Sequence, residues 1–221
     1  MNLHHTDKIS QWEKTDPNDW NFFQKIAART NGVVTPGNVI SLAGLALVMS
    51  GIREIDRGKT LRGISKVGVG RICDVLDGMA AEVTKTKSPL GEAIDAVIDK
   101  IEVAMAYPVL KNQGLVPEPI LRKFRNQQLG NAGLTAIAKI RKLEIHPQKE
   151  GKLSMAELWV STGLYCLSKA IEETEPVVSE ILDTTANEVA ASSIELGNKA
   201  TYGYLFDACG VKETVNKIYA T

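Results

Sequence analysis

The stretch CDVLDGMAAEVTKTKSPLGEAIDAVIDK, residues 73–100, carries two pairs of aspartates. Asp74 and Asp77 are three residues apart, and Asp95 and Asp99 are four residues apart. Residues three or four apart lie on the same face of a helix. Each pair therefore presents its two carboxylates on one side of a predicted helix.

Ser88-Pro89, a predicted N-cap followed by a proline in the first helical turn, starts the second of these helices. The loop before it is short, so we expect two antiparallel neighbours whose four carboxylates face one cleft. Such carboxylates repel each other unless they are protonated or bridged by cations. Oxygen ligands suit Mg²⁺ or Mn²⁺ rather than zinc, and two such ions about 4 Å apart assist displacement at phosphorus. The alternative is four solvated aspartates on exposed faces, which the surrounding alanines and glycines make less natural.

The remaining sequence also has a helical pattern, with no strand-like alternation of any length. Further helices are expected at about 38–53, 119–143, 154–173 and 176–206, with a short tail helix that ends at Tyr219. The helices that carry the aspartates are expected at about 60–84 and 89–110. The predicted fold class is therefore all-α, with six main helices in a bundle.

The expected domain organisation is a polar N-terminal segment, residues 1–30, followed by one helical domain, residues 31–221. Asp16-Pro17 resembles a helix start, and the following WNFFQKIAAR is amphipathic. This N-terminal helix lies either on a membrane surface or against the rest of the domain. Zero net charge gives no indication of a nucleic-acid partner, and three scattered cysteines fit a reducing compartment without disulfides.

The aspartates stand in a pattern that resembles the motif of the CDP-alcohol phosphatidyltransferase family, D-x-x-D-G-x-x-A-R followed by G-x-x-x-D-x-x-x-D. Residues 74–82 and 91–99 match seven of its eight fixed positions, separated by eight residues. The resemblance implies an all-α, six-helix enzyme of this family with an N-terminal amphipathic helix. It implies the transfer of a substituted phosphate from a CDP-linked donor, typically CDP-diacylglycerol, to a small alcohol, with release of CMP.

The resemblance also implies roles for individual residues. Two divalent ions, Mg²⁺ or Mn²⁺, would be held by the four aspartates, and Asp99 would in addition be the base that takes the acceptor's proton. The nucleotide would be bound at the four positions Asp74, Gly78, Ala81 and Gly91. A homodimer is compatible with the resemblance.

Glu82 departs from the family pattern, which has arginine at this position. A carboxylate does not replace a guanidinium near a diphosphate, so either Lys85 or Lys87 helps to hold the donor or activity is impaired. Candidate residues for binding a phosphate-bearing acceptor, such as the glycerol 3-phosphate used by phosphatidylglycerophosphate synthases, are the cations Arg62, Lys66, Lys139, Arg141 and Lys152. The alternative is that these cations are solvated or interfacial charges.

The sequence gives two conflicting indications about the membrane. The family resemblance implies an integral membrane protein. However, Glu102, Lys111 and the acidic stripe of the last helix would each cost about 2.5–3.5 kcal/mol at mid-membrane. These charges favour a soluble, cytoplasmically expressed version of the fold, such as an engineered one. The alternative is a natural member with unusually polar helices. A non-enzymatic helical scaffold that retains a metal or nucleotide site is the alternative function.

Overall fold

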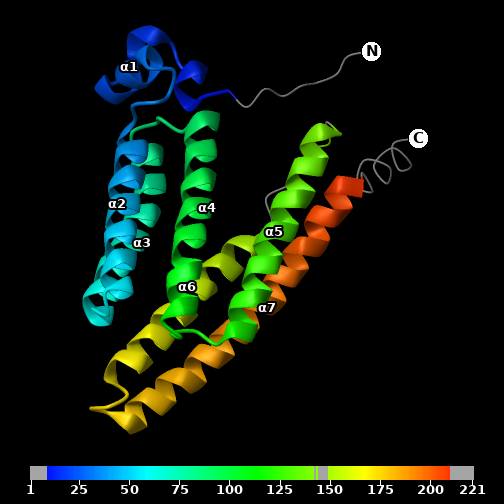
Figure 1. Ribbon diagram of the computed structural model, residues 1–221. Helices are drawn as coiled ribbons and strands as arrows, with labels where there is room; N and C mark the ends of the chain where they lie inside the picture. Colours follow the sequence, from blue (N-terminus) through cyan, green and yellow to red (C-terminus); the bar gives the residue numbers. More distant parts are fainter. Residues whose placement is uncertain (1–8, 142, 144–148, 210–221) are drawn as a thin grey trace. The chain divides into compact units, whose positions relative to one another are not determined.

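The computed structural model describes residues 9–141, 143 and 149–209. Within these residues the secondary structure is helical, without strands (Figure 1). The helices are α1 (Phe22–Arg29), α2 (Pro36–Asp56), α3 (Thr60–Val83), α4 (Pro89–Asn112), α5 (Glu118–Ile140), α6 (Lys149–Ile171) and α7 (Pro176–Cys209). The all-α class and the six long helices, α2 to α7, are confirmed.

The chain divides into two compact units, Met1–Val109 and Leu110–Thr221. The first unit holds α1, α2, α3 and most of α4, and therefore all four motif aspartates. In the second unit, α6 and α7 pack along each other through buried serines. The hydroxyls of Ser154 and Ser193 each donate to the other residue's carbonyl oxygen, at 2.7 and 2.6 Å.

One helix boundary differs clearly from the prediction. Helix α6 begins at Lys149, five residues before the predicted start, so residues 149–152 are helical rather than part of a loop. Glu150 lies in the first turn, where its negative charge interacts favourably with the positive end of the helix dipole. Gly151 destabilises the helix by only about 1 kcal/mol relative to alanine. The predicted tail helix to Tyr219 lies outside the described residues.

The N-terminal helix begins later than predicted. Pro17–Asp19 forms only a 3₁₀ turn, and α1 starts at Phe22, after the cap residue Asn21. The side chain of Asn21 accepts from the amide of Gln24, and the Gln24 side chain accepts from the amide of Asn21, both at 2.9 Å. This capping box fixes the start of the helix. Phe22 and Phe23 are exposed, so the aromatic side of α1 faces away from the rest of the unit.

Glycines bring the backbones of α2 and α3 into direct contact. Gly37, Gly44 and Gly51 recur every seven residues along α2, and Gly63 and Gly70 are seven apart on α3. A Cβ added to Gly51 would lie 2.6 Å from the carbonyl oxygen of Gly63, and one added to Gly44 would lie 3.0 Å from that of Gly70. Close backbone approach therefore explains the glycines that otherwise weaken both helices.

The contact between α2 and α3 gives a test with a matched control. A Cβ at Gly63 would lie 2.7 Å from the carbonyl oxygen of Gly51, whereas a Cβ at Gly68 meets nothing within 4 Å. We expect Gly63→Ala to lower the free energy of unfolding by about 1–3 kcal/mol through overpacking. Gly68→Ala should raise it by up to about 1 kcal/mol through helix propensity. Thermal or denaturant unfolding of both variants measures the contrast, and equal effects would contradict the close packing.

The start of α4 confirms the predicted cap. The amide of Gly91 donates to the hydroxyl of Ser88 at 3.0 Å, and Pro89 is the first helical residue. A Cβ added to Gly91 would lie 3.2 Å from the side-chain oxygen of Asn38 on α2. The cap and this close approach place the beginning of α4 against the beginning of α2.

Candidate active site

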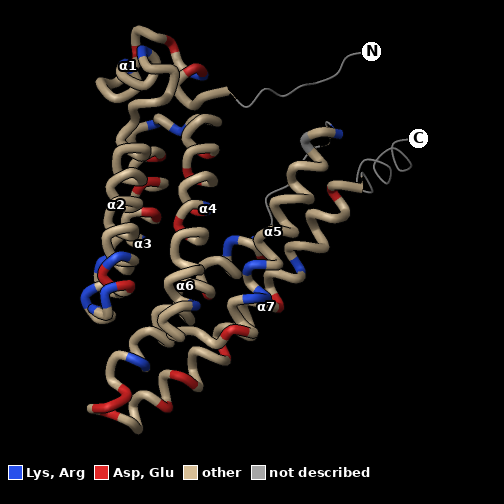
Figure 2. Tube along the Cα trace, in the orientation of Figure 1, with Lys and Arg blue, Asp and Glu red and all other residues tan. Residues whose placement is uncertain are grey.

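Three motif aspartates meet between α3 and α4. Helix α3 supplies Asp74 and Asp77, and α4 supplies Asp95. One carboxylate oxygen from each lies within 4.8 Å of the others, which is a geometry able to hold a metal ion. Figure 2 shows the acidic positions along α3 and α4 in the first unit. The predicted convergence of two carboxylate pairs is thus found for three of the four residues.

The surroundings of Asp77 and Asp95 test whether a cation suits this cluster. Asp77 is buried and accepts a short hydrogen bond from the hydroxyl of Ser41 on α2. Oxygen Oδ1 of Asp95 is buried, and no group among the described residues donates a hydrogen bond to it. A buried carboxylate oxygen without a donor is costly, and a hard cation is a partner that suits its charge and chemistry. The residues present therefore fit a Mg²⁺ or Mn²⁺ ion.

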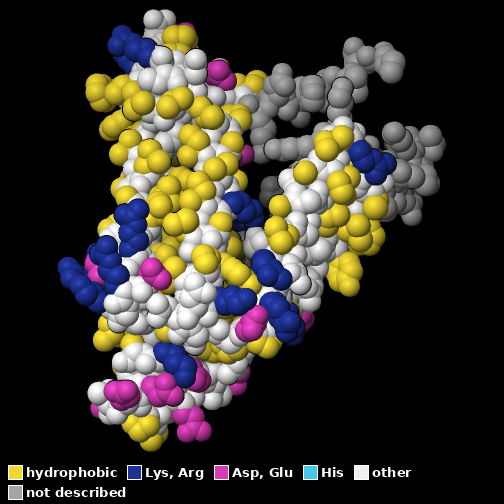
Figure 3. Space-filling model, viewed as in Figure 1, with side chains coloured by type: hydrophobic (Ala, Val, Ile, Leu, Met, Phe, Trp, Pro, Cys, Tyr) yellow, Lys and Arg dark blue, Asp and Glu magenta, His cyan; other side chains and the backbone are white. Residues whose placement is uncertain are grey.

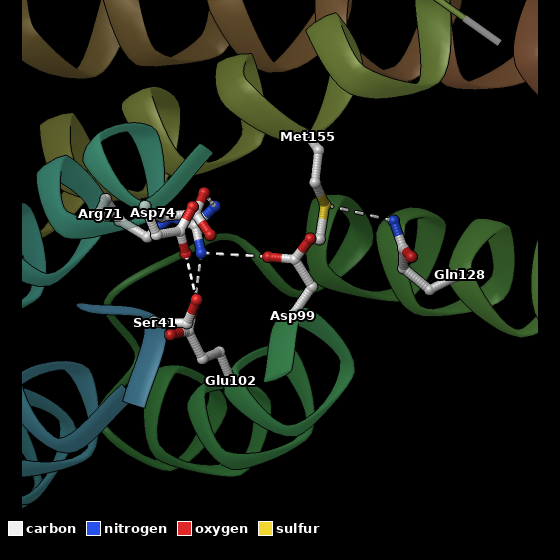
Figure 4. Close-up of polar contacts among 8 residues, drawn as sticks. Ser41, Arg71, Asp74, Asp99, Glu102, Gln128 and Met155 are labelled. Atoms are coloured by element: carbon white, nitrogen blue, oxygen red, sulfur yellow. Dashed lines mark hydrogen bonds and ion pairs between the residues drawn. The ribbon is translucent and has the colours of Figure 1, made fainter. Parts of the chain in front are cut away.

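Asp99, the fourth aspartate, lies outside this cluster and is paired with an arginine. Its Oδ1 accepts a hydrogen bond from Nη1 of Arg71 at 3.1 Å (Figure 4). The same Nη1 lies 2.5 Å from Oε2 of Glu102, and Nη2 lies 2.8 Å from Oδ2 of Asp74. The cluster of three aspartates that could hold a metal ion does not include Asp99, which is paired with a guanidinium.

The small residues of the motif have different surroundings. Gly78 has open space where a side chain would project, with nothing within 4 Å of an added Cβ. Ala81 instead lies against α2, where a Cβ added to Gly37 would come within 3.1 Å of it. Gly91 lies against Asn38, as described above. Three small residues are predicted to bind the nucleotide. Gly78 has open space beside it, whereas Ala81 and Gly91 lie in contacts with α2.

Glu82 contacts a residue of the loop before α4. Its carboxylate pairs with Nζ of Lys87 at 3.0 Å, and both side chains are largely exposed. An exposed pair of this kind stabilises a protein by about 0–1 kcal/mol. Glu82 and Lys87 therefore offset each other's charge at the position where the family motif has a cation.

We expect Glu82→Arg to improve use of a CDP-linked donor. The substitution removes the negative charge that pairs with Lys87 and adds a guanidinium, whose geometry suits a diphosphate. The KM for the donor should fall by about tenfold, the equivalent of one charge-assisted hydrogen bond. Steady-state kinetics with Glu82→Gln as control separates the added cation from the lost anion. An unchanged KM in Glu82→Arg would show that the donor is held away from this position.

The candidate acceptor-binding cations of the first unit have distinct surroundings. Arg62 is exposed on α3. Nζ of Lys66 donates to the hydroxyl of Ser50 at 2.9 Å and to Oε1 of Glu54 at 3.3 Å. Lys66 is thus already paired with residues of α2, whereas Arg62 is exposed to solvent.

The other three candidate cations belong to the second unit. Nη1 of Arg141 donates to the carbonyl oxygen of Ala208 at 2.8 Å, which ties the end of α5 to α7. Lys152 is exposed on α6. The side chain of Lys139 lies outside the described part of the chain. A structural contact of Arg141 is therefore established, and an acceptor-binding role for the set stays a prediction.

Sequence reasoning missed three residues around the aspartates: Ser41 and Arg71, which contact them, and Glu102, which contacts Arg71. Glu102 had been counted among the charges that oppose membrane insertion, but it is buried and paired with Arg71. A signal was present for two of them, because Arg71 precedes Asp74 by three residues and Glu102 follows Asp99 by three. That spacing places them on the aspartate-bearing helix faces. Nothing in the sequence pairs Ser41 with Asp77.

A known protein family and a solved structure are similar to this chain. No curated protein sequence matches the chain significantly. Among solved structures, the crystal structure of Mycobacterium tuberculosis phosphatidylinositol phosphate synthase (PgsA1) with CDP-DAG bound is similar, with 15% sequence identity and a TM-score of 0.48. The match covers 83% of this chain and 93% of that one. The family model for CDP-alcohol phosphatidyltransferase matches residues 34–190, more than half of the sequence and the whole aspartate motif. The chain therefore belongs to the CDP-alcohol phosphatidyltransferase family.

Proposed function

We propose that this protein transfers a substituted phosphate from a CDP-linked lipid donor, such as CDP-diacylglycerol, to a small alcohol and releases CMP. The observation that carries the proposal is the cluster of Asp74, Asp77 and Asp95, with the buried oxygen of Asp95 that lacks a donor among the described residues. Membership of the family supports the reaction class.

Each group has a chemical task in this reaction. Asp74, Asp77 and Asp95 would hold divalent ions, and Mg²⁺ or Mn²⁺, when bound, neutralises the charge of the diphosphate and of the leaving CMP. The acceptor's hydroxyl oxygen forms a bond to the phosphorus that bears the lipid, and the bond from that phosphorus to the bridging oxygen breaks. CMP leaves with the electron pair, and Asp99 takes the hydroxyl proton.

The open space at Gly78 supports a nucleotide site beside the cluster. Gly78 directly follows Asp77, and nothing lies within 4 Å of where its side chain would be. A nucleotide whose diphosphate contacts the cluster has room at this point of α3. Because Glu82 pairs with Lys87, the two side chains together carry no net positive charge. We therefore propose that divalent ions at the aspartate cluster would supply most of the attraction for the donor.

We also propose that the protein acts within a membrane, as members of this membrane-integral family do. Helix α2 has the length and composition of a membrane span, the one such helix among the described residues. On α3, large apolar side chains face outward at helical spacing, namely Ile72, Val75, Leu76, Met79 and Val83. Hydrophobic side chains cover much of the visible face of the first unit (Figure 3).

An exposed apolar face of this kind is suited to lipid rather than water. The buried pairing of Glu102 also removes one of the charges that favoured a soluble version of the fold. Expression followed by detergent-free fractionation tests the membrane proposal. Recovery in the membrane fraction is expected, and a monodisperse protein in the soluble fraction would contradict it.

Release of CMP from CDP-diacylglycerol tests the proposed reaction. We expect release that requires Mn²⁺ or Mg²⁺ and an added alcohol, and that stops when the metal is chelated. A panel that contains glycerol 3-phosphate and glycerol tests whether a phosphate-bearing acceptor is preferred, as the candidate cations of the sequence predict. Metal and CMP binding without any transfer would contradict the enzymatic proposal.

A further inference from the structure

Arg71 joins the metal cluster to the fourth aspartate but occupies no position of the family motif. Its guanidinium contacts carboxylates on both helices: Nη2 lies 2.8 Å from Asp74 on α3, and Nη1 lies 3.1 Å from Asp99 on α4. Nη1 also lies 2.5 Å from Glu102, one turn beyond Asp99 (Figure 4). A planar guanidinium with five donors suits several carboxylates held in fixed directions.

Glu102 explains why the guanidinium stays in this place. The Glu102 side chain is only 3% exposed, and it sits on the same face of α4 as Asp99. A buried carboxylate is stable only when a partner compensates for its lost hydration, and Arg71 is a partner in direct contact. Glu102 thus anchors Arg71, and Arg71 in turn contacts Asp99.

The arrangement separates two kinds of aspartate. Asp74, Asp77 and Asp95 offer oxygens within 4.8 Å of one another, as metal ligands do. Asp99 lies outside this group and accepts from Nη1 of Arg71, while Nη2 of the same guanidinium binds Asp74. A charge-assisted hydrogen bond of this kind holds a carboxylate in one orientation. A carboxylate held in a fixed orientation next to the three clustered aspartates suits a proton acceptor.

We propose that Arg71, anchored by Glu102, is a positioning residue that holds Asp99 as the base of the transfer reaction, apart from the metal ligands. The inference rests on the proposed function and deepens it. It assigns the pair Arg71–Glu102 a part in the chemical step and none in binding the metal or the donor.

Arg71→Ala tests this division of roles. We expect kcat to fall by about 100-fold, the effect of misplacing a catalytic group by about 1 Å. The KM for CDP-diacylglycerol and the Mn²⁺ dissociation constant, measured by electron paramagnetic resonance, should change by less than about threefold, because loss of a positive charge beside Asp74 does not weaken binding of a cation. Asp74→Asn is the contrasting variant and should weaken Mn²⁺ binding by tenfold or more.

Chemical rescue separates positioning from a general structural role. Guanidinium ion added at millimolar concentration should restore part of kcat in Arg71→Ala, because Glu102 still offers it a buried carboxylate. The same addition should not rescue Asp99→Asn, which lacks the base itself. Arg57→Ala, which removes an exposed cation at the end of α2, is the control and should retain wild-type kcat.

The double variant Arg71→Gln/Glu102→Gln covers the case in which an unpaired Glu102 destabilises the protein. It removes both charges together and keeps polar side chains at both positions. We expect it to bind Mn²⁺ like the wild type, to show a lowered kcat, and to gain nothing from guanidinium.

The outcomes distinguish this inference from the proposed function. If the wild type releases no CMP, the proposed function fails and the inference fails with it. If the wild type is active and Arg71→Ala keeps its kcat, or loses Mn²⁺ binding as Asp74→Asn does, the positioning role alone is overturned.

Discussion

Asp95→Asn should reduce the kcat/KM of metal-dependent transfer by about 100- to 1,000-fold, the range found when an electrostatic group of a reaction centre is removed. Asp95 brings the one carboxylate of the cluster that comes from α4, and its buried Oδ1 has no donor among the described residues. Asparagine keeps one neutral oxygen but removes the charge that attracts a divalent ion. CMP release with increasing Mn²⁺ measures the loss.

The same substitution should stabilise the protein in the absence of metal. Three carboxylates within 4.8 Å repel each other, and neutralising one relieves that repulsion. With EDTA, the Tm of Asp95→Asn should therefore exceed that of the wild type. With Mn²⁺ at about 100 times its dissociation constant, the wild type should gain about 2.7 kcal/mol, and the variant should gain far less.

Glu92→Gln on the same helix is the matched control, since Glu92 is exposed and lies outside the cluster. It should leave the Mn²⁺-dependent rise in Tm and the rate of CMP release unchanged. A metal-induced gain in Asp95→Asn as large as in the wild type would show that the ion binds elsewhere.

Asp99→Asn should lower kcat by about 100- to 10,000-fold, the range for loss of a general base. Asparagine retains the size of aspartate and can still accept from Arg71, but it cannot take a proton from the acceptor. Because Asp99 lies outside the group of three oxygens that could hold a metal ion, Mn²⁺ affinity should remain within about threefold of the wild type. Kinetics at saturating donor and metal isolate the change in kcat.

Asp99→Asn also separates the two roles that the family resemblance implies for this residue. Loss of kcat with retained Mn²⁺ affinity supports a base. A parallel loss of Mn²⁺ affinity would make Asp99 a metal ligand, and unchanged CMP release would exclude both roles.

The sequence predicted the helices well because their boundaries carry strong local signals. Ser88-Pro89 starts α4 where expected, since an N-cap and a proline act within one turn. The predicted start of α6 was wrong. Gly151 and the neighbouring charged residues have weak preferences for loop over helix, which helix packing can override. Local signals therefore fix most elements but not every boundary.

The site was predictable only as far as the motif reaches along the chain. The spacing of Asp74, Asp77 and Asp95 was sufficient to expect their convergence, because helix periodicity and a short loop determine it. The contacts of Arg71 with Glu102 depend on how α3 and α4 are turned toward each other, which no single helix pattern specifies. The outward apolar face of α3 was likewise hidden, because glycines and charges interrupt it in the sequence.

An oxygen label tests the central claim of phosphate transfer most directly. The alcohol that supports CMP release is supplied with ¹⁸O in its hydroxyl group, and the products are analysed by mass spectrometry. We expect one CMP without label for each phospholipid product, whose new phosphodiester carries the ¹⁸O. CMP release at the same rate without alcohol, or a lipid product without ¹⁸O, would contradict transfer to the acceptor.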